Sequence, residues 1–283
     1  MRREIEHRLS FFETWLRNQR YSEKTIVTYV KAIKVFFLFF DSKLPEQITI
    51  SDFHSFNKDF IIKQGYSASY QNQVINAIKL FYLKVEHKEL NIELIERPRK
   101  YRPLPKVIPK EVIQRMLTSI PNLKHQTALT LIYSCGLRRS ELINLKLCHL
   151  DSKRRTLSVI NGKGQKDRVL PVSEKMMQII IKYYKMYKPT VYLIEGQVKG
   201  QKYSETSLEN IFHKYLGMIY KNHKFTLHCL RHSYATHLLE SGVNLRYIQE
   251  LLGHKSSKTT EIYTYVSTHS LSTIRNPIDD FDL

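Results

Sequence analysis

Hydrophobic residues in the first part of the chain recur at helical spacing only. Ser22 is a typical N-terminal helix cap, and after it apolar positions follow at intervals of three and four residues. A second run with the same spacing starts at about Ser69. We therefore predict an all-helical domain over residues 1–95. The apolar positions of the two runs are Ile26, Tyr29, Val30, Ile33, Phe36 and Phe37, then Val74, Ile75, Ile78, Phe81 and Tyr82.

Residues 96–107 interrupt this helical pattern with three prolines and five basic residues. Proline cannot continue a helix, and so many charges stay in water. We interpret the stretch as a linker between two domains, although a surface loop inside one domain would have the same composition. A basic linker is suited to lie along a phosphate backbone. Its candidate DNA contacts are Arg97, Arg99, Lys100, Arg102 and Lys106.

After the linker, helical and strand patterns alternate. A helix over residues 123–135 is predicted to end at Gly136, and the β-rich runs 156–160 and 168–172 flank a glycine-containing turn, which predicts a β-hairpin. The expected fold class is mainly α: a helical N-terminal domain, then a mostly helical domain over residues 108–283 with a small antiparallel β-sheet. Further expected helix starts and ends are Pro109, Ser173, Ser207 or a near neighbour, Thr226, Ser241–Gly242, Gly253, and Ser256 or Ser257.

The charge of the chain narrows the classes of partner. Lysine and arginine number 45 against 26 acidic residues, which gives a formal net charge of +19. Such a surface attracts polyanions, most commonly nucleic acid, although anionic lipid or no polyanion at all would fit the charge alone. The longest apolar run, residues 35–40, is too short to span a bilayer, and no signal peptide opens the chain.

The cysteines add little chemistry. Cys135, Cys148 and Cys229 are scattered and odd in number, so they do not form a disulfide framework. This usage fits a reducing compartment, and we expect a cytoplasmic, nucleoid-associated protein.

Two short motifs place cations on helices. His228 and Arg231 are three residues apart, so an imidazole and a guanidinium project from one helix face, where they can bind phosphate oxygens. His228 and His232 also have a metal-ligand spacing, but the intervening residues lack the acid of a zinc site. At the end of the helix that stops at Gly136, Glu141 can orient Arg138. Each motif taken alone is more often a solvated helix surface.

The hairpin and the chain near the C-terminus supply the other candidates. Glycines on both sides of Lys163 leave its ammonium free to donate a proton, with Lys166 as a close competitor. Tyr263 is one of 18 tyrosines and is a poor nucleophile unless cations activate it. Lys166 and Arg168 are further candidate DNA contacts.

Taken in order, these blocks resemble the signature of the tyrosine recombinase, or phage integrase, family, and most closely its Xer-like branch. The likeness covers about residues 109–268, and more weakly the first domain. Tyr265 is an alternative nucleophile, but the spacing from His254 favours Tyr263. The matching blocks are Gly136-Leu137-Arg138-x-Ser140-Glu141, Gly162-Lys163-Gly164, His228-x-x-Arg231-His232-Ser233, Leu251-Leu252-Gly253-His254 and Ile262-Tyr263.

The resemblance implies a role for each catalytic position. Arg138 and Arg231 would clamp the scissile phosphate, His254 would hydrogen-bond it, His228 would assist deprotonation of Tyr263, and Lys163 would protonate the departing 5′ oxygen. Tyr263 would form a 3′-phosphotyrosyl link, with no cofactor and no metal ion. The expected partners are double-stranded DNA with paired inverted-repeat sites and further copies of the chain, as a tetramer on two sites.

Two other functions stay open at this point. A type IB topoisomerase-like enzyme shares the residue chemistry, and a non-catalytic DNA-binding protein shares the basic surface. Integration or excision, inversion and dimer resolution all use one architecture. Because the first helix starts almost at once, we expect a simple-site recombinase without an added DNA-binding domain. In the tail, Ile274, Ile278 and Phe281 would anchor on a neighbouring subunit, or the segment is a frayed acidic end.

Overall fold

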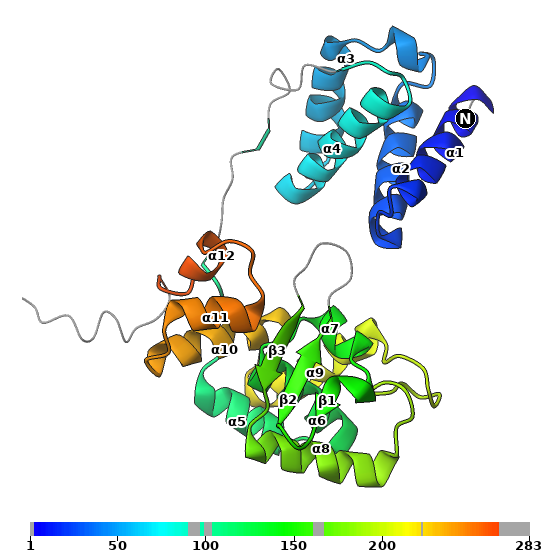
Figure 1. Cartoon of the computed structure of the whole chain (residues 1–283). Coiled ribbons are helices and arrows are strands. Elements are labelled where there is room, and N and C mark those ends of the chain that lie inside the picture. Colours follow the sequence, from blue (N-terminus) through cyan, green and yellow to red (C-terminus); the bar gives the residue numbers. More distant parts are fainter. Residues whose placement is uncertain (1–2, 90–96, 99–103, 161–166, 222, 266–283) are drawn as a thin grey trace, which may run out of the picture. The chain divides into compact units, whose positions relative to one another are not determined.

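The computed structural model describes residues 3–89, 97–98, 104–160, 167–221 and 223–265. The chain divides into two compact units, residues 1–102 and residues 103–283 (Figure 1). This division falls within the stretch that the prolines mark as a linker. The fold is mainly helical in both units, as predicted, with one small antiparallel sheet in the second.

The first unit is a helical bundle. Ser22 caps α2 by accepting a hydrogen bond from the Thr25 amide, and Ser67 caps α4 in the same way through Tyr70. Helix α2 packs against both α1 and α4. The elements are α1 (Arg3–Asn18), α2 (Glu23–Phe39), the 3₁₀ turn η1 (Pro45–Gln47), α3 (Ile50–Ser55), the π-helical segment η2 (Phe56–Ile62) and α4 (Ala68–Lys84).

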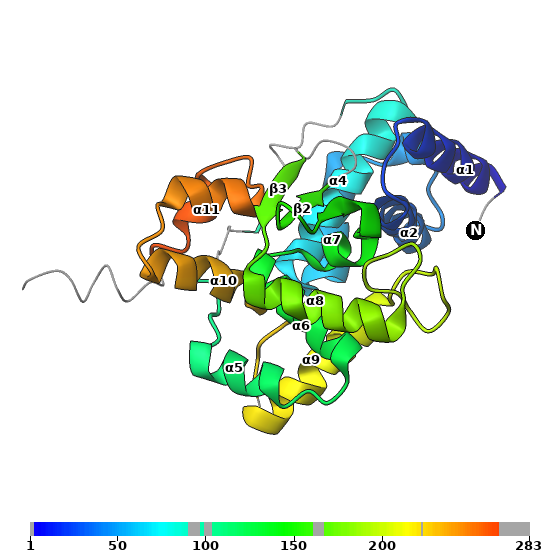
Figure 2. The same cartoon turned by 60° about the horizontal axis from the view of Figure 1, so that its bottom comes forward.

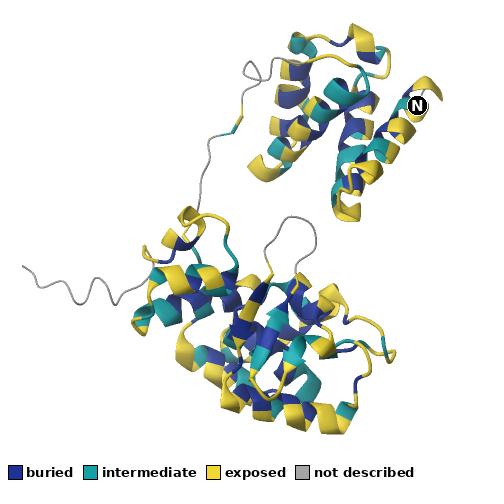
Figure 3. Ribbon diagram, in the orientation of Figure 1, coloured by how far each residue is buried: buried dark blue, intermediate teal, exposed yellow. Residues whose placement is uncertain are grey.

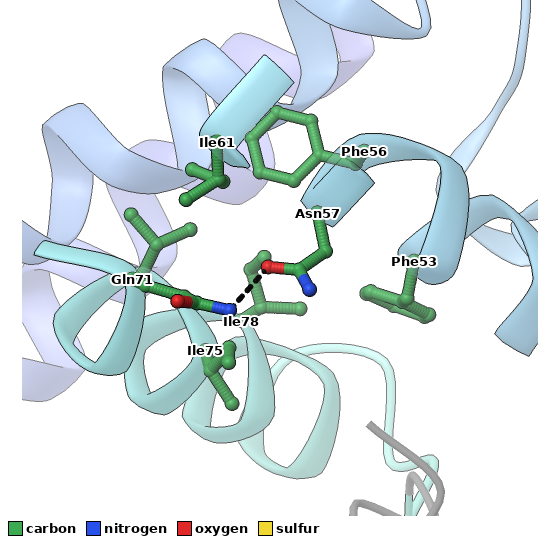
Figure 4. Close-up of a pocket in the computed structure, with 8 residues that line it drawn as sticks. Phe53, Phe56, Asn57, Ile61, Gln71, Ile75 and Ile78 are labelled. Carbon is green, nitrogen blue, oxygen red and sulfur yellow. Dashed lines mark hydrogen bonds between the residues drawn. The ribbon is translucent and has the colours of Figure 1, made fainter. Parts of the chain in front are cut away.

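Aromatic rings fill the core of this unit. Phe36 is fully buried, and its ring contacts the ring of Phe53 in a stacked arrangement and that of Phe56 edge to face. The helices accordingly carry buried stripes beside exposed ones (Figure 3). A pair of polar side chains also lies inside: the Gln71 side-chain amide donates to Asn57 Oδ1 at 2.8 Å beside a small cavity (Figure 4). The pair satisfies groups that would otherwise be buried without partners.

The second unit starts with the helices that the sequence predicts and adds several short elements. Helix α6 ends at Gly136, which adopts the left-handed conformation with φ of 59°, and Ser173 caps α8. The elements are α5 (Lys110–Thr118), α6 (Leu123–Cys135), α7 (Arg139–Asn144), η4 (Leu147–His149), β1 (Leu150–Asp151), β2 (Thr156–Val159), β3 (Arg168–Pro171), α8 (Glu174–Tyr187), α9 (Glu205–Ile219), α10 (His228–Glu240), α11 (Leu245–Leu252) and α12 (Lys258–Glu261).

One expected helix start, Ser207 or a near neighbour, is confirmed at Ser204, and another, Thr226, is corrected. Helix α9 begins at Glu205 with Ser204 as its cap, because the Ser204 hydroxyl accepts from the amide of Ser207. Helix α10 begins at His228 with Leu227 at the cap position, so the hydroxyl of Thr226 does not cap it. The amide of Cys229 donates to the Thr226 backbone carbonyl instead.

The sheet has the order β1-β2-β3, and all pairs are antiparallel. The predicted hairpin is present as β2 and β3, in which Leu157 pairs with Leu170 and Val159 with Arg168. Strand β1 was not predicted, since two residues are too short to show a period. Helix α11 packs against β3, and both α10 and α11 lie beside this edge of the sheet (Figures 1 and 2). Helix α10 also packs on α6, so segments distant in sequence meet here.

No helix in the described part of the chain is long and apolar enough to cross a membrane.

Candidate active site

Arg138 lies where two helices meet at a glycine. A side chain at Gly136 would strain the positive φ, and its Cβ would lie 2.5 Å from the ring of Tyr234. The chain can therefore turn sharply after α6 and bring Arg138 to the start of α7. There Glu141 accepts from the Arg138 amide at 2.8 Å and from its guanidinium at 2.7 Å.

Glu141 is the centre of a buried charge network. Besides Arg138, it binds Arg168 through two hydrogen bonds of 3.0 and 2.8 Å, and its Oε2 lies 3.7 Å from Arg231 Nη1. Burial by itself would raise the pKa of Glu141, but the hydrogen bonds and charge of Arg168, with those of Arg138, hold it at about 2. The carboxylate is therefore ionised at neutral pH.

The position of Arg168 corrects one expectation from the sequence. It was a candidate DNA contact at the base of the hairpin, but its side chain is only 6% exposed and faces Glu141. Its Nε donates to the carbonyl of Leu251 at 2.7 Å. The residue on strand β3 thus ties Glu141 to helix α11, because the register of the sheet turns it inward.

Arg231 is buried at the centre of the site, with 1% of its surface exposed. Its guanidinium donates to the carbonyls of Gly136 at 2.5 Å and Leu252 at 2.6 Å, and lies 3.2 Å from His254 Nε2. Burial, followed by the charge of Arg138, lowers the pKa of Arg231 to about 9, so it remains charged at neutral pH. Both carbonyls belong to helix ends, whose free acceptors suit a cation.

His254 follows directly on Gly253, the left-handed residue that ends α11. Because Arg231 only donates, His254 Nε2 must accept, and the ring proton then lies on Nδ1, which is 2.9 Å from Thr260 Oγ1. Burial and the charges of Arg231 and Arg138 lower the pKa of His254 to about 3. The imidazole is therefore neutral here. Its ring stacks on that of Tyr263 at a centroid distance of 6.4 Å.

Tyr263 lies in a small apolar cluster with Ala235, Ile248 and Leu252, and it is 1% exposed. Burial raises the pKa of its hydroxyl, while Arg231 and Arg138 act to lower it. The hydroxyl lies 3.0 Å from Nδ1 of His232. The neighbour of the hydroxyl is therefore His232, whereas the sequence pointed to His228.

His228 is exposed, and its ring lies perpendicular to that of His232 at 4.4 Å. The two residues are four apart on α10 and share a face, as the spacing predicts. In the sequence, that spacing suggested a pair of metal ligands. No local pattern points to His232 as a partner of the tyrosine, or to Thr260 as the partner of His254. Among the described residues, no group of three or more histidine, cysteine or acidic side chains is placed to hold a metal ion.

The other candidates are dispersed or cannot be placed. Arg97 donates to Asn72 and Asn76 on α4, and Lys106 donates to the carbonyl of Lys224; both side chains belong to exposed residues. Contact of either with DNA stays a prediction. The candidates that lie outside the described residues are Lys163, Lys166, Arg99, Lys100, Arg102 and the tail positions Ile274, Ile278 and Phe281.

Both units of the chain are similar to known protein families. Residues 106–269 match the model of the phage integrase family, and residues 9–92 match that family's N-terminal SAM-like domain. The chain belongs to the phage integrase family. It is thus a tyrosine recombinase, as the sequence motifs indicated.

Two relatives illustrate the extent of the likeness. The recombinase is 38% identical over 212 residues to the tyrosine recombinase XerA of Pyrococcus horikoshii, which covers 74% of this chain and 73% of the relative. It is 32% identical over 275 residues to a tyrosine recombinase of Pseudothermotoga lettingae, which covers 93% of this chain and 94% of the other.

Solved structures agree on the fold. The crystal structure of a XerA recombinase matches with a TM-score of 0.56 and 26% identity, over 96% of this recombinase and all of that chain. XerH recombinase bound to a palindromic difH substrate matches with a TM-score of 0.73 over 87% of this recombinase and 78% of that chain. At 20% identity, the second match supports the fold alone.

Proposed function

We propose that this recombinase cuts and rejoins DNA strands through a covalent 3′-phosphotyrosyl link at Tyr263. The observation that carries the proposal is an unbroken series of contacts. It runs from Glu141 to Arg138 and Arg231, from Arg231 to His254, and from His254 to the ring of Tyr263. Cations and a nucleophile therefore gather at one point, although they come from α7, α10 and the segments after α11 and α12.

The chemistry follows from the charges. Arg138 and Arg231 would bind the non-bridging oxygens of the scissile phosphate and stabilise the charge that builds up in the transition state. His254 would hydrogen-bond the phosphate once its ring proton lies on Nε2, a tautomer different from that of the DNA-free site, and Lys163 would protonate the leaving 5′ oxygen. One phosphodiester is exchanged for another of similar energy, so neither ATP nor a metal ion is required.

We propose that the reaction takes place on paired inverted-repeat sites held by a tetramer, and that it is simple-site recombination: integration or excision, inversion, or dimer resolution. Family membership and the net charge of +19 support DNA as the partner. Binding should depend steeply on salt, since log affinity falls by about 0.9 per phosphate contact for each log unit of salt.

Trapping of the covalent adduct tests the nucleophile. We would incubate the full chain with a library of randomised duplexes that carry a nick in one strand, so that a short cleaved strand diffuses away and religation fails. The wild type should form an adduct that survives denaturant, and sequencing of the trapped DNA would give the site. Tyr263→Phe should form no adduct and bind DNA to within about threefold of the wild type.

Tyr265→Phe is the matched control. Tyr265 is two residues away and 72% exposed, so its loss should leave adduct formation unchanged. An adduct with Tyr263→Phe, or none with Tyr265→Phe, would contradict the assignment of the nucleophile. No adduct with the wild type would contradict the enzymatic proposal itself.

A plasmid assay then separates recombination from topoisomerase action. On supercoiled plasmids with two trapped sites, we expect excision when the sites are in direct orientation and inversion when they are opposed. Relaxation of a plasmid without any site would favour a nicking-closing enzyme instead.

A further inference from the structure

We infer that His232 is the residue that accepts the proton of Tyr263 when this tyrosine attacks DNA. The inference deepens the proposed function and rests on it. Its basis is the 3.0 Å distance between His232 Nδ1 and the Tyr263 hydroxyl. The comparable contact for His228 is with the ring of His232, not with the tyrosine.

The direction of this hydrogen bond follows from burial. Tyr263 is 1% exposed, and a buried hydroxyl proton needs an acceptor. Among the described residues, His232 Nδ1 is the group that bonds to this hydroxyl. If Nδ1 carried the ring proton, the tyrosine proton would lack an acceptor. The neutral imidazole therefore has its proton on Nε2, and Tyr263 donates to Nδ1.

The site keeps this proton on the tyrosine until DNA is bound. Burial raises the pKa of Tyr263, whereas burial, followed by the neighbouring His228 and Arg231, lowers that of His232 to about 4. The charged and titratable groups that face His232 are His228, Arg231, His254 and Tyr263. A bound phosphate adds negative charge beside Arg231, which offsets the positive potential that opposes an imidazolium at His232. Transfer is thus coupled to attack.

The complete step is balanced. The oxygen of Tyr263 forms a bond to phosphorus while its O–H bond breaks, and the proton passes to His232 Nδ1. The bond from phosphorus to the 5′ oxygen breaks, and this oxygen takes a proton from the general acid, Lys163 in the proposed function. In rejoining, the 5′ hydroxyl attacks and returns its proton to Lys163, while the departing tyrosine oxygen regains its proton from His232.

The geometry of helix α10 explains why the adjacent residues Arg231 and His232 have different roles. Successive positions lie about 100° apart around a helix. Arg231 consequently points into the core against Gly136 and Leu252, while His232 turns to the face that Tyr263 covers. His228, one turn earlier on the same face, packs edge-on against the His232 ring and fixes its plane.

The test is a variant that keeps the hydrogen bond to the Tyr263 hydroxyl but cannot accept its proton. In His232→Asn, the amide oxygen lies near the place of Nδ1 and can accept a hydrogen bond, but it cannot take up a proton. We would measure single-turnover adduct formation on the nicked duplex trapped with the wild type. We expect a rate at least about 100-fold lower at pH 7, the scale of a lost general base, with DNA binding within about threefold.

The pH dependence of the rate distinguishes a general base at position 232 from a residue with a structural role only. The deficit of His232→Asn should shrink as the pH rises towards 10, because the tyrosine then loses its proton to solvent. His228→Asn, the same change one turn away, should lose less and keep the shape of the wild-type profile. A deficit that is constant with pH, or a larger loss in His228→Asn, would overturn the inference.

A substrate with a bridging sulfur at the 5′ position gives an independent result. Thiolate leaves without protonation, so this substrate should restore a Lys163→Ala variant and leave His232→Asn slow. Restoration of His232→Asn would place its action at the leaving group and overturn the inference. Should His232→Asn fail to fold, His232→Gln serves in the same assays with the same expected loss. Absence of any wild-type adduct would instead count against the proposed function.

Discussion

The interiors of the two units hold different kinds of polar group. In the described part of the first unit, the buried polar residues are Asn57 and Gln71, which bond to each other among aromatic rings. The second unit buries Glu141, Arg168 and Arg231 in one network beside Tyr263. A neutral amide pair costs little to bury, whereas charges lose their hydration. Glu86 of the first unit also loses hydration, in an ion pair with Arg8, but the network of three buried charges lies in the second unit, which indicates that this unit carries the chemistry.

The variant with the largest expected effect removes the carboxylate at the centre of this network. Glu141→Gln has the same shape but removes the negative charge that faces Arg138, Arg168 and Arg231. Breaking a buried ion pair on one side costs about 3–5 kcal/mol, so we expect the second unit to lose that much stability and adduct formation to be abolished.

The single tryptophan allows the two units to be followed separately. Trp15 lies in α1 of the first unit, so its fluorescence reports that unit, while circular dichroism reports both. Glu141→Gln should shift the transition seen by circular dichroism and leave that of Trp15 in place. Equal shifts of both would mean that the two interiors are not independent. Glu209→Gln is a control, because Glu209 pairs with Arg139 at the surface.

Acidification should destabilise the second unit more than the first, by somewhat less than Glu141→Gln does. His232 and His254 have pKa values of about 4 and about 3, well below the value near 6.5 of an unfolded chain. Between pH 6.5 and about 4 the unfolded chain binds protons that the folded unit does not, so stability falls as the pH falls. For the two histidines together we expect a loss of about 2–4 kcal/mol at pH 4.5.

The first unit should behave differently in the same titration. Burial raises the pKa of Glu86, so acidification relieves a buried charge there and does not weaken that unit. Burial alone would raise the pKa of Asp52, but the bonds from Lys43 and Thr49 lower it below its ordinary value of 3.8, which is itself below pH 4.5. Thermal melts at pH 7 and pH 4.5 should therefore shift the dichroism transition, with little change for Trp15. A Trp15 transition that falls equally would contradict this assignment.

Local features of the fold were predictable from the sequence, and the reason is physical. Ser22 and Ser173 cap helices through hydrogen bonds to residues three positions away, and Gly136 ends α6 through its own backbone conformation. Such signals depend on no distant contact. The motif spacing also brought Arg138, Arg231, His254 and Tyr263 forward as one set, because these residues match the motifs of a family.

The remaining features depend on contacts that the sequence does not encode locally. Arg168 bonds to Leu251, which is 83 positions away, and only the packing of β3 on α11 makes it a buried residue. The same holds for His232, whose distance to Tyr263 depends on how α12 returns the chain to α10. The failure of Thr226 as a cap is of a different kind. The hydroxyl of Thr226 lies 3.6 Å from the sulfur of Cys229, so a side-chain contact takes the place of a bond to a backbone amide.

The smallest expected effect concerns the neutral pair of the first unit. Asn57→Ala leaves the amide of Gln71 buried without a partner, which costs about 1–2 kcal/mol. The double variant Asn57→Leu with Gln71→Leu removes both polar groups and fills the adjoining cavity, so it should recover most of that loss. Denaturant melts of Trp15 fluorescence would measure both. No such exchange exists for Glu141, because an apolar residue there would still face three arginines. If the double variant were less stable than Asn57→Ala, the amide pair would be holding η2 against α4, and the two interiors would differ less than their charges indicate.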